Sequence, residues 1–181
     1  ITMVLIAAYI HHIHALHTAN QPPPEEIKMK ALFNQLIKSG VFTTSAGFDT
    51  LPVRLAVGVI FAAHGAQKLF GWFGGYGLEG TAGWMASIGL EPGLPLALLA
   101  GSAEFFGGIL LILGFLVRPA ALALAATMVV AIMTVHINNG LFMSNGGYEF
   151  GLALLVVSIG LVIRGAGSLS ADYTIHLAQS S

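Results

Sequence analysis

Four long apolar runs dominate the chain after residue 50, and each is close to the length of a membrane-spanning helix. They cover Pro52–Phe73, Leu94–Phe115, Pro119–Ile137 and Tyr148–Ile163. A helix needs about 20 predominantly apolar residues to cross the hydrocarbon core of a bilayer. The fourth run is short but extends through Gly146. The pattern therefore predicts an all-α, polytopic membrane protein built on a bundle of four transmembrane helices.

The residues before these runs show a weaker pattern. Residues 1–20 start apolar but become polar at His11, after about ten apolar positions, too few to cross a bilayer. The prolines of Gln21–Glu26 predict an extended linker. Ile27–Ser39 places apolar residues at helical spacing with lysines off that face. This spacing predicts either an amphipathic helix on the membrane surface or an ordinary packing helix.

Four histidines crowd into the first segment. On a helix His11 and His14 share a face, as do His14 and His17, so weak metal binding is one interpretation. The polar end of an interfacial or partner-contacting helix is the other, and we predict no metal site here. The chain then divides into a His-rich segment (1–20), a linker with an amphipathic interfacial helix (21–50), a membrane domain (51–165) and a polar cytoplasmic tail (166–181).

Composition supports the membrane interpretation. The 181 residues are 56% hydrophobic and only 8% charged, whereas soluble domains carry about 25% charged residues. The net charge of −1, with no basic patch, gives no support for a nucleic-acid partner. The absence of cysteine excludes disulfides, Cys-ligated zinc and Cys-ligated iron–sulfur clusters. The 23 glycines are typical of helices that pack closely in lipid.

Basic residues predict the orientation of the bundle. The side on which the first run begins carries six lysines and arginines, and the other side carries Lys68 alone together with Glu79 and Glu91. The positive-inside rule then places the first side, and both termini, in the cytoplasm. We expect Arg54 and Arg118 to be interface anchors there. The basic residues on that side are Lys28, Lys30, Lys38, Arg54, Arg118 and Arg164.

Five ionisable residues interrupt or border the apolar runs. His64 and Lys68 are one helical turn apart in the first run, and Glu104 lies near the middle of the second. His136 ends the third run, and Glu149 begins the fourth. Because four consecutive spans are antiparallel, all five residues fall in the outer half of the bundle. Charged groups in lipid face the bundle interior and pair with one another.

These five residues have a structural and a functional interpretation. They could only fix the register of the helices, or they could line a site for a polar ligand, a quinone head group or a proton. A metal or haem held by His64 and His136 is a weaker alternative, because the usual set of three or four ligands is not evident. We predict His64, Lys68, Glu104, His136 and Glu149 as catalytic candidates. We predict His64, Lys68, Glu104 and Asn138 as cofactor-binding candidates.

Several of these residues also carry a family resemblance. The stretches GVIFAAHGAQKLFGWFGG, AEFFGGILLILGFLVRPAALALAATMVVAIMTVHINNG and GGYEFGLALLVVSIGLVI resemble the DoxX family of small bacterial membrane proteins. The resemblance covers Leu51–Gly165. It implies a four-helix bundle in the bacterial inner membrane, related to the small subunit of thiosulfate:quinone oxidoreductase. The first 50 residues fall outside it and look like an accessory extension that docks to a partner.

Three functions follow from these observations. The first is a membrane subunit of a quinone-linked oxidoreductase, in which the outer pocket binds quinone and the electrons come from a substrate or another subunit. The second is a non-catalytic scaffold or accessory subunit of a larger membrane complex. An ion or proton pathway is the third, although no matching polar groups lie in the cytoplasmic half. We expect lipid and other membrane subunits, or a second copy of the chain, as partners.

Overall fold

The computed structural model describes residues 23–38, 40, 42, 44 and 47–180, and every regular element among them is helical. The four histidines of residues 1–20 lie outside the described residues. The chain divides into two compact units, residues 1–40 and 41–181. In the first unit, α2 covers Pro24–Lys38, so a helix forms at the amphipathic pattern but begins inside the segment predicted as an extended linker. It begins at Pro24 because proline suits the first turn of a helix.

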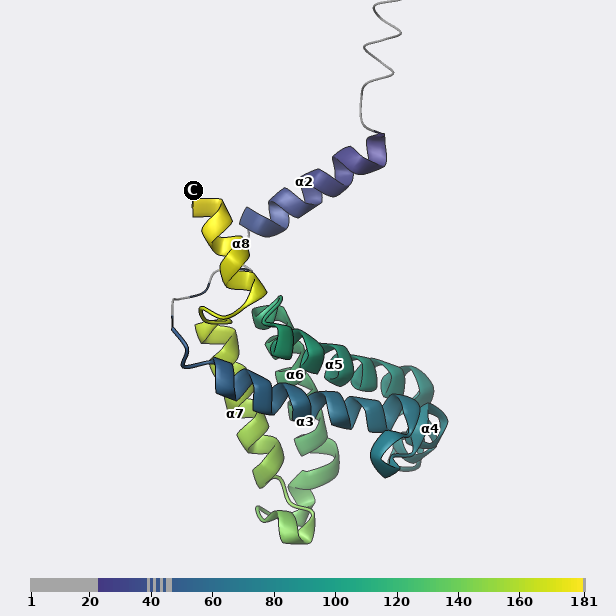
Figure 1. Cartoon of the computed structure of the whole chain (residues 1–181). Helices are drawn as coiled ribbons and strands as arrows, with labels where there is room; N and C mark the ends of the chain where they lie inside the picture. The colour runs from purple at the N-terminus through teal and green to yellow at the C-terminus, as the bar shows by residue number, and fades with distance from the viewer. Residues whose placement is uncertain (1–22, 39, 41, 43, 45–46, 181) are drawn as a thin grey trace, which may run out of the picture. The chain divides into compact units, whose positions relative to one another are not determined.

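The second unit holds two pairs of packed helices. Figure 1 shows α3 running along α5 and α6 running along α7, with the two pairs pointing in different directions. A π-helical turn, η2 (Ile132–His136), prolongs α6, and the short 3₁₀ turns are η1 (Trp72–Gly74), η3 (Ile137–Asn139) and η4 (Met143–Asn145). The α-helices are α3 (Leu51–Phe70), α4 (Gly77–Ser87), α5 (Gly93–Leu113), α6 (Val117–Ala131), α7 (Glu149–Arg164) and α8 (Ala171–Ser180).

Three helices of the described residues are long and apolar enough to cross a membrane. They are Leu51–Phe70, Gly93–Leu113 and Val117–Asn139, the last being α6 with its π and 3₁₀ continuation. The fourth predicted span is helical, but α7 has 16 residues. At a rise of about 1.5 Å per residue it measures about 24 Å, short of the hydrocarbon thickness of about 30 Å. Helices thus form at all four predicted runs, and three reach spanning length.

Glycines set the ends of the first two long helices. Gly71 follows α3 with φ +72° and Gly114 follows α5 with φ +67°, the left-handed conformation that ends helices. The N–H of Phe115 donates to the carbonyl of Leu110, which closes the turn. The chain reverses within three residues, and α6 starts at Val117. A tight turn therefore joins the second and third long helices.

Glycines also explain why α3 and α5 pack so closely. A Cβ added to Gly58 would lie 2.8 Å from the carbonyl oxygen of Gly108, and a Cβ on Gly65 would overlap the backbone of Phe105. Each position is on a face where the two backbones touch. Such small residues let helices approach in lipid, where packing replaces the hydrophobic effect as the main attraction between helices.

The main apolar core lies where the two pairs meet. Phe61 of α3, Leu111 of α5 and Leu124 of α6 are almost completely buried, as is Leu161 of α7. Side chains in such a core gain many weak dispersion contacts. One core therefore connects both pairs. The buried cluster comprises Val57, Phe61, Leu111, Val117, Ala120, Ala121, Leu124, Met128, Leu154, Leu161 and Ala166.

Two helices form where the pattern predicted none. The glycine-rich connection after the first span contains α4, which packs on α5 through Ala82, Met85 and Ala97. The polar segment after residue 165 contains α8. Its Asp172 is only 1% exposed and accepts hydrogen bonds from the N–H groups of Leu116 (2.8 Å) and Val117 (2.9 Å). The carboxylate thus caps the start of α6.

Arg54 lies beside this cap and is fully buried, at 0% exposure. Its Nη1 donates to the carbonyl of Leu111 at 3.3 Å and its Nη2 to that of Leu169 at 2.6 Å. The prediction that Arg54 is an interface anchor is therefore wrong. The residue instead connects α3, the end of α5 and the segment that leads into α8.

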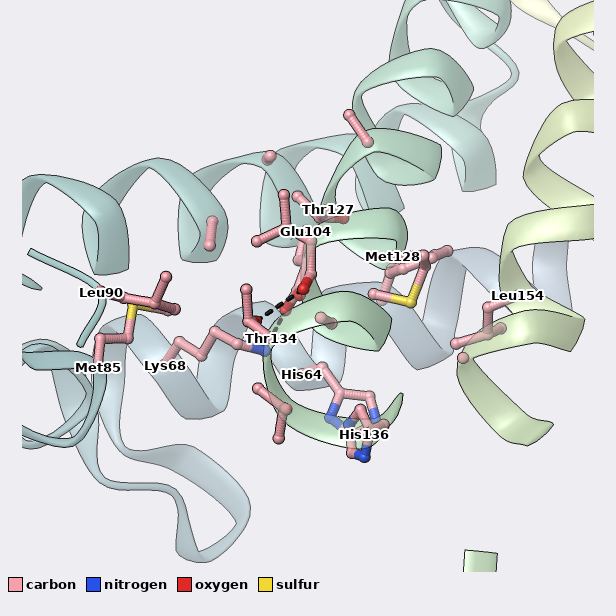
Figure 2. Close-up of a pocket in the computed structure, with 18 of the residues that line it drawn as sticks. His64, Lys68, Met85, Leu90, Glu104, Thr127, Met128, Thr134, His136 and Leu154 are labelled. Carbon is pink, nitrogen blue, oxygen red and sulfur yellow. Dashed lines mark hydrogen bonds and ion pairs between the residues drawn. The ribbon is translucent and has the colours of Figure 1, made fainter. Parts of the chain in front are cut away.

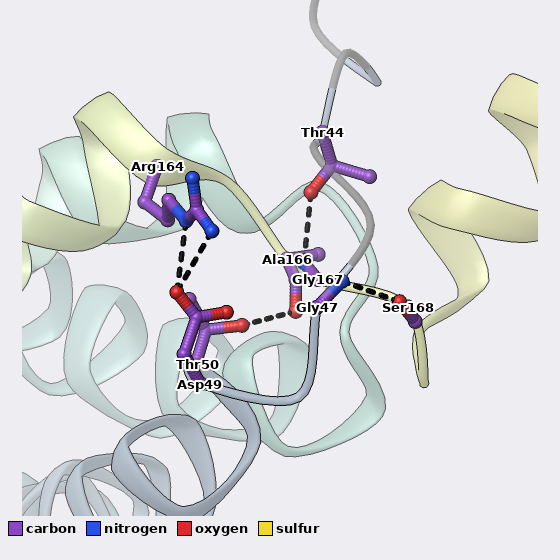
Figure 3. Close-up of polar contacts among 8 residues, drawn as sticks. All are labelled: Thr44, Gly47, Asp49, Thr50, Arg164, Ala166, Gly167 and Ser168. Carbon is purple, nitrogen blue, oxygen red and sulfur yellow. Dashed lines mark hydrogen bonds and ion pairs between the residues drawn. The ribbon is translucent and has the colours of Figure 1, made fainter.

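Polar contacts also join the segment before α3 to the segment after α7 (Figure 3). Thr50 donates to the carbonyl of Ala166 at 2.7 Å, and the N–H of Gly167 donates to the hydroxyl of Thr44 at 2.7 Å. Gly47 and Ser168 exchange two further hydrogen bonds. Residues before α3 therefore belong to the helical unit rather than to an independent linker.

Candidate functional site

A cavity of about 600 Å³ lies between the α3–α5 pair and the α6–α7 pair. Its volume is in the range of pockets that hold small organic ligands, about 300–1,000 Å³. Helix α4 contributes Trp84 and Met85 to its wall, and the loop 140–147 contributes Met143, Gly146 and Gly147. Its walls are mostly apolar. The ionisable residues of the described chain that line it are His64, Lys68, Glu104 and His136.

Lys68 and Glu104 form an ion pair on the wall of this cavity (Figure 2). The Lys68 Nζ lies 2.5 Å from Oε2 of Glu104. The Glu104 side chain is 4% exposed, whereas that of Lys68 is 26% exposed. The ammonium of Lys68 is therefore the member of the pair that a ligand in the cavity can contact more easily. The general expectation that charged groups in the apolar runs pair with one another is thus met by these two residues.

A glycine makes room for this pair. Gly101 precedes Glu104 by one helical turn on α5, and a Cβ added to it would lie 3.3 Å from Cβ of Lys68 and closer still to the side chain of Leu69. A larger residue at this position would push α3 away from α5. The ion pair thus depends on the same close approach of the two helices that Gly65 and Gly108 allow.

His64 approaches the cavity from α3. Its ring centroid lies 6.5 Å from that of Phe150 on α7, with the planes inclined by 52°. It precedes Lys68 by one turn, so both side chains leave α3 on the same face. His64 and Phe150 both line the cavity, and their rings meet where α3 faces α7.

His136 reaches the cavity from the end of the π-helical turn. Its Nδ1 lies 2.7 Å from the carbonyl oxygen of Gly146. A carbonyl oxygen can only accept, so Nδ1 carries the proton of this hydrogen bond. In the neutral ring, Nε2 is then left as a hydrogen-bond acceptor. The loop 140–147, which forms part of the cavity wall, thereby fixes the tautomer of His136.

The π-helical turn shifts the register of the residues that end α6 and line the cavity. Thr134, Val135 and His136 all line it. In a regular α-helix, residues two apart point in different directions. The wider π turn of Ile132–His136 changes this register, and such turns occur frequently at functional sites. Periodicity assumes a uniform helix, so it could not predict this arrangement.

Glu149 and Asn138 do not line the cavity. Oε1 of Glu149 accepts a 2.6 Å hydrogen bond from the N–H of Met143. The carboxylate therefore holds the loop that carries Gly146, the partner of His136. Asn138 is exposed in η3, and its neighbour Asn139 donates instead to the carbonyl of Gly146 at 3.2 Å. The structure thus brings four of the five catalytic candidates to one cavity and places Glu149 behind the loop.

Two threonines of the lining were missed by the sequence analysis. Thr127 donates to the carbonyl of Leu124 at 2.8 Å, and Thr134 donates to that of Val130 at 2.7 Å. With their protons engaged in the helix, their oxygens can still accept a hydrogen bond. They are seven residues apart in an otherwise apolar run, and this spacing, two helical turns, is the signal that could have identified them.

The electrostatics of the cavity favour an uncharged ligand. The charges of Lys68 and Glu104 cancel, and neutral imidazoles add none. The groups available to a ligand are an ammonium donor, imidazole nitrogens and threonine oxygens. In the part of the chain that is described, no three His, Cys, Asp or Glu side chains gather as metal ligands would. The arrangement suits hydrogen bonding to, and proton exchange with, an oxygen-bearing neutral molecule.

Comparison with known proteins identifies the family of this chain. The DoxX family profile matches residues 50–137. A protein named "Putative oxidoreductase CatD" from Bacillus subtilis (strain 168) is 36% identical over 123 residues, which cover 68% of this chain and 84% of that protein. The chain belongs to the DoxX family.

A second relative also matches this chain. An "Uncharacterized protein" of Haemophilus influenzae is 34% identical over 128 residues, which cover 66% of this DoxX chain and 85% of that protein. No solved structure matches the chain. The DoxX match spans α3 to η3, so it includes His64, Lys68, Glu104 and His136. Family membership and the three apolar helices identify a membrane protein.

Proposed function

We propose that this DoxX chain is a multi-pass subunit of a quinone-linked redox system in the bacterial inner membrane, and that its cavity receives the quinone head group. The observation that carries the proposal is the Lys68–Glu104 ion pair on the wall of an apolar cavity that two histidines also line. A similarity to a protein named as an oxidoreductase supports the redox part. In this proposal α7 is a fourth span and both termini are cytoplasmic.

The residues of the cavity fit a quinone head group. A quinone is an uncharged ring with two carbonyl oxygens, and a bound quinone accepts two electrons and two protons to become a quinol. Lys68 is a hydrogen-bond donor whose ammonium stabilises negative charge that develops on an oxygen. The apolar walls exclude water and so strengthen that interaction.

His136 is the group best placed to hold and move a proton. Its Nδ1 is engaged by Gly146, so Nε2 is the atom that gains or loses the proton. His64 of α3 offers a second imidazole to the same cavity. Since the sequence contains no cysteine, we propose that electrons arrive from a substrate or from another subunit.

Binding of a short-chain quinone to the full chain in lipid nanodiscs tests the proposal. Replacing both members of the pair, Lys68→Met with Glu104→Gln, removes the charges without leaving one of them unpaired. We expect affinity to fall by about tenfold or more, equivalent to about 1.4 kcal/mol. Glu79→Gln, on the exposed face of α4, is the matched control and should bind like the wild type. Unchanged affinity in the double variant would contradict the proposal.

The ion pair also favours a second candidate, a non-catalytic scaffold. Lys68 and Glu104 join α3 to α5, so they could serve only to fix the register of these helices. A scaffold should copurify with its partners in fixed stoichiometry, and the complex should keep its activity when His64 and Glu104 are replaced. Loss of activity with the complex intact would exclude this candidate.

A further inference from the structure

One opening of the cavity lies between α5 and α6. Leu99 of α5 and Val130 of α6 both line it, yet they are 68% and 53% exposed on the surface of the chain. Ala123 and Ala126 of α6 also line it and are exposed. Figure 1 shows why, because α5 and α6 separate from the tight turn that joins them and run in different directions. A residue can only line the cavity and face outward where the wall is incomplete.

The surroundings of this opening are apolar. Next to it on the surface lie Leu98 of α5 and Leu122 and Val129 of α6, all well exposed. Both helices are long and apolar enough to span a membrane. Leu99 lies six residues inside α5, about 9 Å along its axis. In a spanning helix this depth lies within the hydrocarbon, so the opening faces acyl chains rather than water or lipid head groups.

The carboxylate of the ion pair lies deeper than the opening. Glu104 is buried and its partner Lys68 reaches the cavity from α3, behind α5 as seen from the opening. Alanines rather than large side chains border the passage on α6. A ligand that suits both the polar groups of the cavity and its apolar opening has a compact oxygen-bearing head and a long apolar chain. A transmembrane helix of another protein fits the cavity less well. A single helical turn, about 10 Å across, already has a volume of about 400 Å³, a large part of the cavity volume of about 600 Å³.

We infer that the opening between α5 and α6 is a lateral portal through which a membrane-dissolved ligand inserts its head group while its apolar chain remains among Ala123, Ala126 and Val130. This inference rests on the proposed function for the identity of the head group. It adds the route of entry and makes the length of the apolar chain a determinant of affinity.

The first test needs no quinone. The chain has no cysteine, so single variants Leu99→Cys and Val130→Cys can carry a nitroxide spin label in nanodiscs. Collision with oxygen, which concentrates in lipid, is compared with collision with a water-soluble nickel chelate. Leu122→Cys, exposed on α6 outside the cavity, is the lipid reference, and Ser144→Cys in the loop 140–147 is the water reference.

We expect the labels at Leu99 and Val130 to behave like the label at Leu122. Behaviour like that at Ser144 would show a water-filled opening and overturn the portal. Protection from both reagents would show that another polypeptide covers the opening, and would overturn it too. Neither outcome depends on whether the head group is a quinone.

The second test compares two quinones that share a head group, one with a long isoprenoid chain and one with a single isoprene unit. Ala123→Phe and Ala126→Phe should weaken the long-chain quinone by about tenfold while changing the short-chain one by less than about twofold. Ala153→Phe, on an exposed position of α7 away from the cavity, is the control. Equal losses, or none, would overturn the portal. Failure of the wild type to bind either quinone would overturn the proposed head group, and the spin-label result would still decide the portal.

Discussion

Asp172 of α8 accepts a 2.9 Å hydrogen bond from the backbone N–H of Val117, the first residue of α6. Its other oxygen accepts from Leu116, so one carboxylate satisfies two N–H groups that a helix start leaves without partners. Burial raises the pKa of the Asp172 carboxyl above its ordinary value. The two hydrogen bonds and the positive charges of Arg54 and Arg118 oppose this effect on the pKa.

The raised pKa predicts how stability depends on pH. In the folded state the Asp172 carboxyl holds its proton more tightly than in the unfolded state. Its contribution to the free energy of unfolding is therefore fully present below about pH 4, the ordinary pKa. That contribution is lost as pH rises through the folded-state pKa. Asp172→Asn keeps one carbonyl acceptor and cannot ionise, so it should lack this pH dependence and be at least as stable as the wild type at pH 7.

Asp172→Ala should behave differently because it removes the cap. We expect it to lose about 0.5–2 kcal/mol, the usual cost of losing a helix cap. Thermal unfolding in detergent between pH 4 and pH 8 measures all three proteins, with the exposed Asp49→Asn as control. If the Asn variant is as unstable as the Ala variant at pH 7, the carbonyl acceptor of residue 172 does not cap α6.

The close approach of α3 and α5 gives a second prediction. Gly65→Val places a branched side chain against the backbone of Phe105, which cannot move without separating the helices. Overpacking of this kind costs about 1–3 kcal/mol or more. Gly160→Ala on α7 is the control, because nothing lies within 4 Å of its added Cβ. It should be neutral or slightly stabilising, and equal unfolding temperatures for the two variants would refute the close packing.

The helices and the ion pair were predictable because their causes lie in the sequence pattern. A run of apolar residues near spanning length admits little but a helix in lipid. A lysine and a glutamate inside such runs must find partners away from lipid, so Lys68 and Glu104 could be paired by topology alone. His64 and His136 came to the same cavity for the same reason.

The rest depends on backbone geometry that no periodicity records. Glu149 binds the N–H of Met143, a partner set by the path of the loop. The π-helical turn changes which residues of 132–136 face inward. Asp172 lies in a polar segment, where nothing in the composition distinguishes a buried carboxylate from an exposed one. An arginine near a helix start, such as Arg54, stands in the same sequence pattern whether its side chain contacts lipid or is buried in the protein.

The buried ion pair predicts strongly non-additive effects on stability. Lys68→Met alone leaves the carboxylate of Glu104, 4% exposed, without its counter-charge. Removing one partner of a buried pair costs about 3–5 kcal/mol, and the partial exposure of Lys68 puts this case toward the lower end. Adding Glu104→Gln should recover most of the loss. Unfolding temperatures of the two single variants and the double variant form a cycle, and simple additivity would rule out coupling between the two residues.

The buried guanidinium of Arg54 gives the last prediction. Two of its nitrogens donate to carbonyls on different segments, those of Leu111 and Leu169. Lysine keeps the charge but is a single point donor, so it cannot span the two acceptors as the planar fork does. We expect Arg54→Lys to lose about 1.5–3 kcal/mol, the contribution of hydrogen bonds to charged groups. Arg164→Lys is the matched control, because Arg164 and its partner Asp49 are both about half exposed, at 49% and 55%, and such pairs contribute about 0–1 kcal/mol. If the two variants unfold at the same temperature in detergent, the guanidinium of Arg54 does not hold the α8 segment against the end of α5.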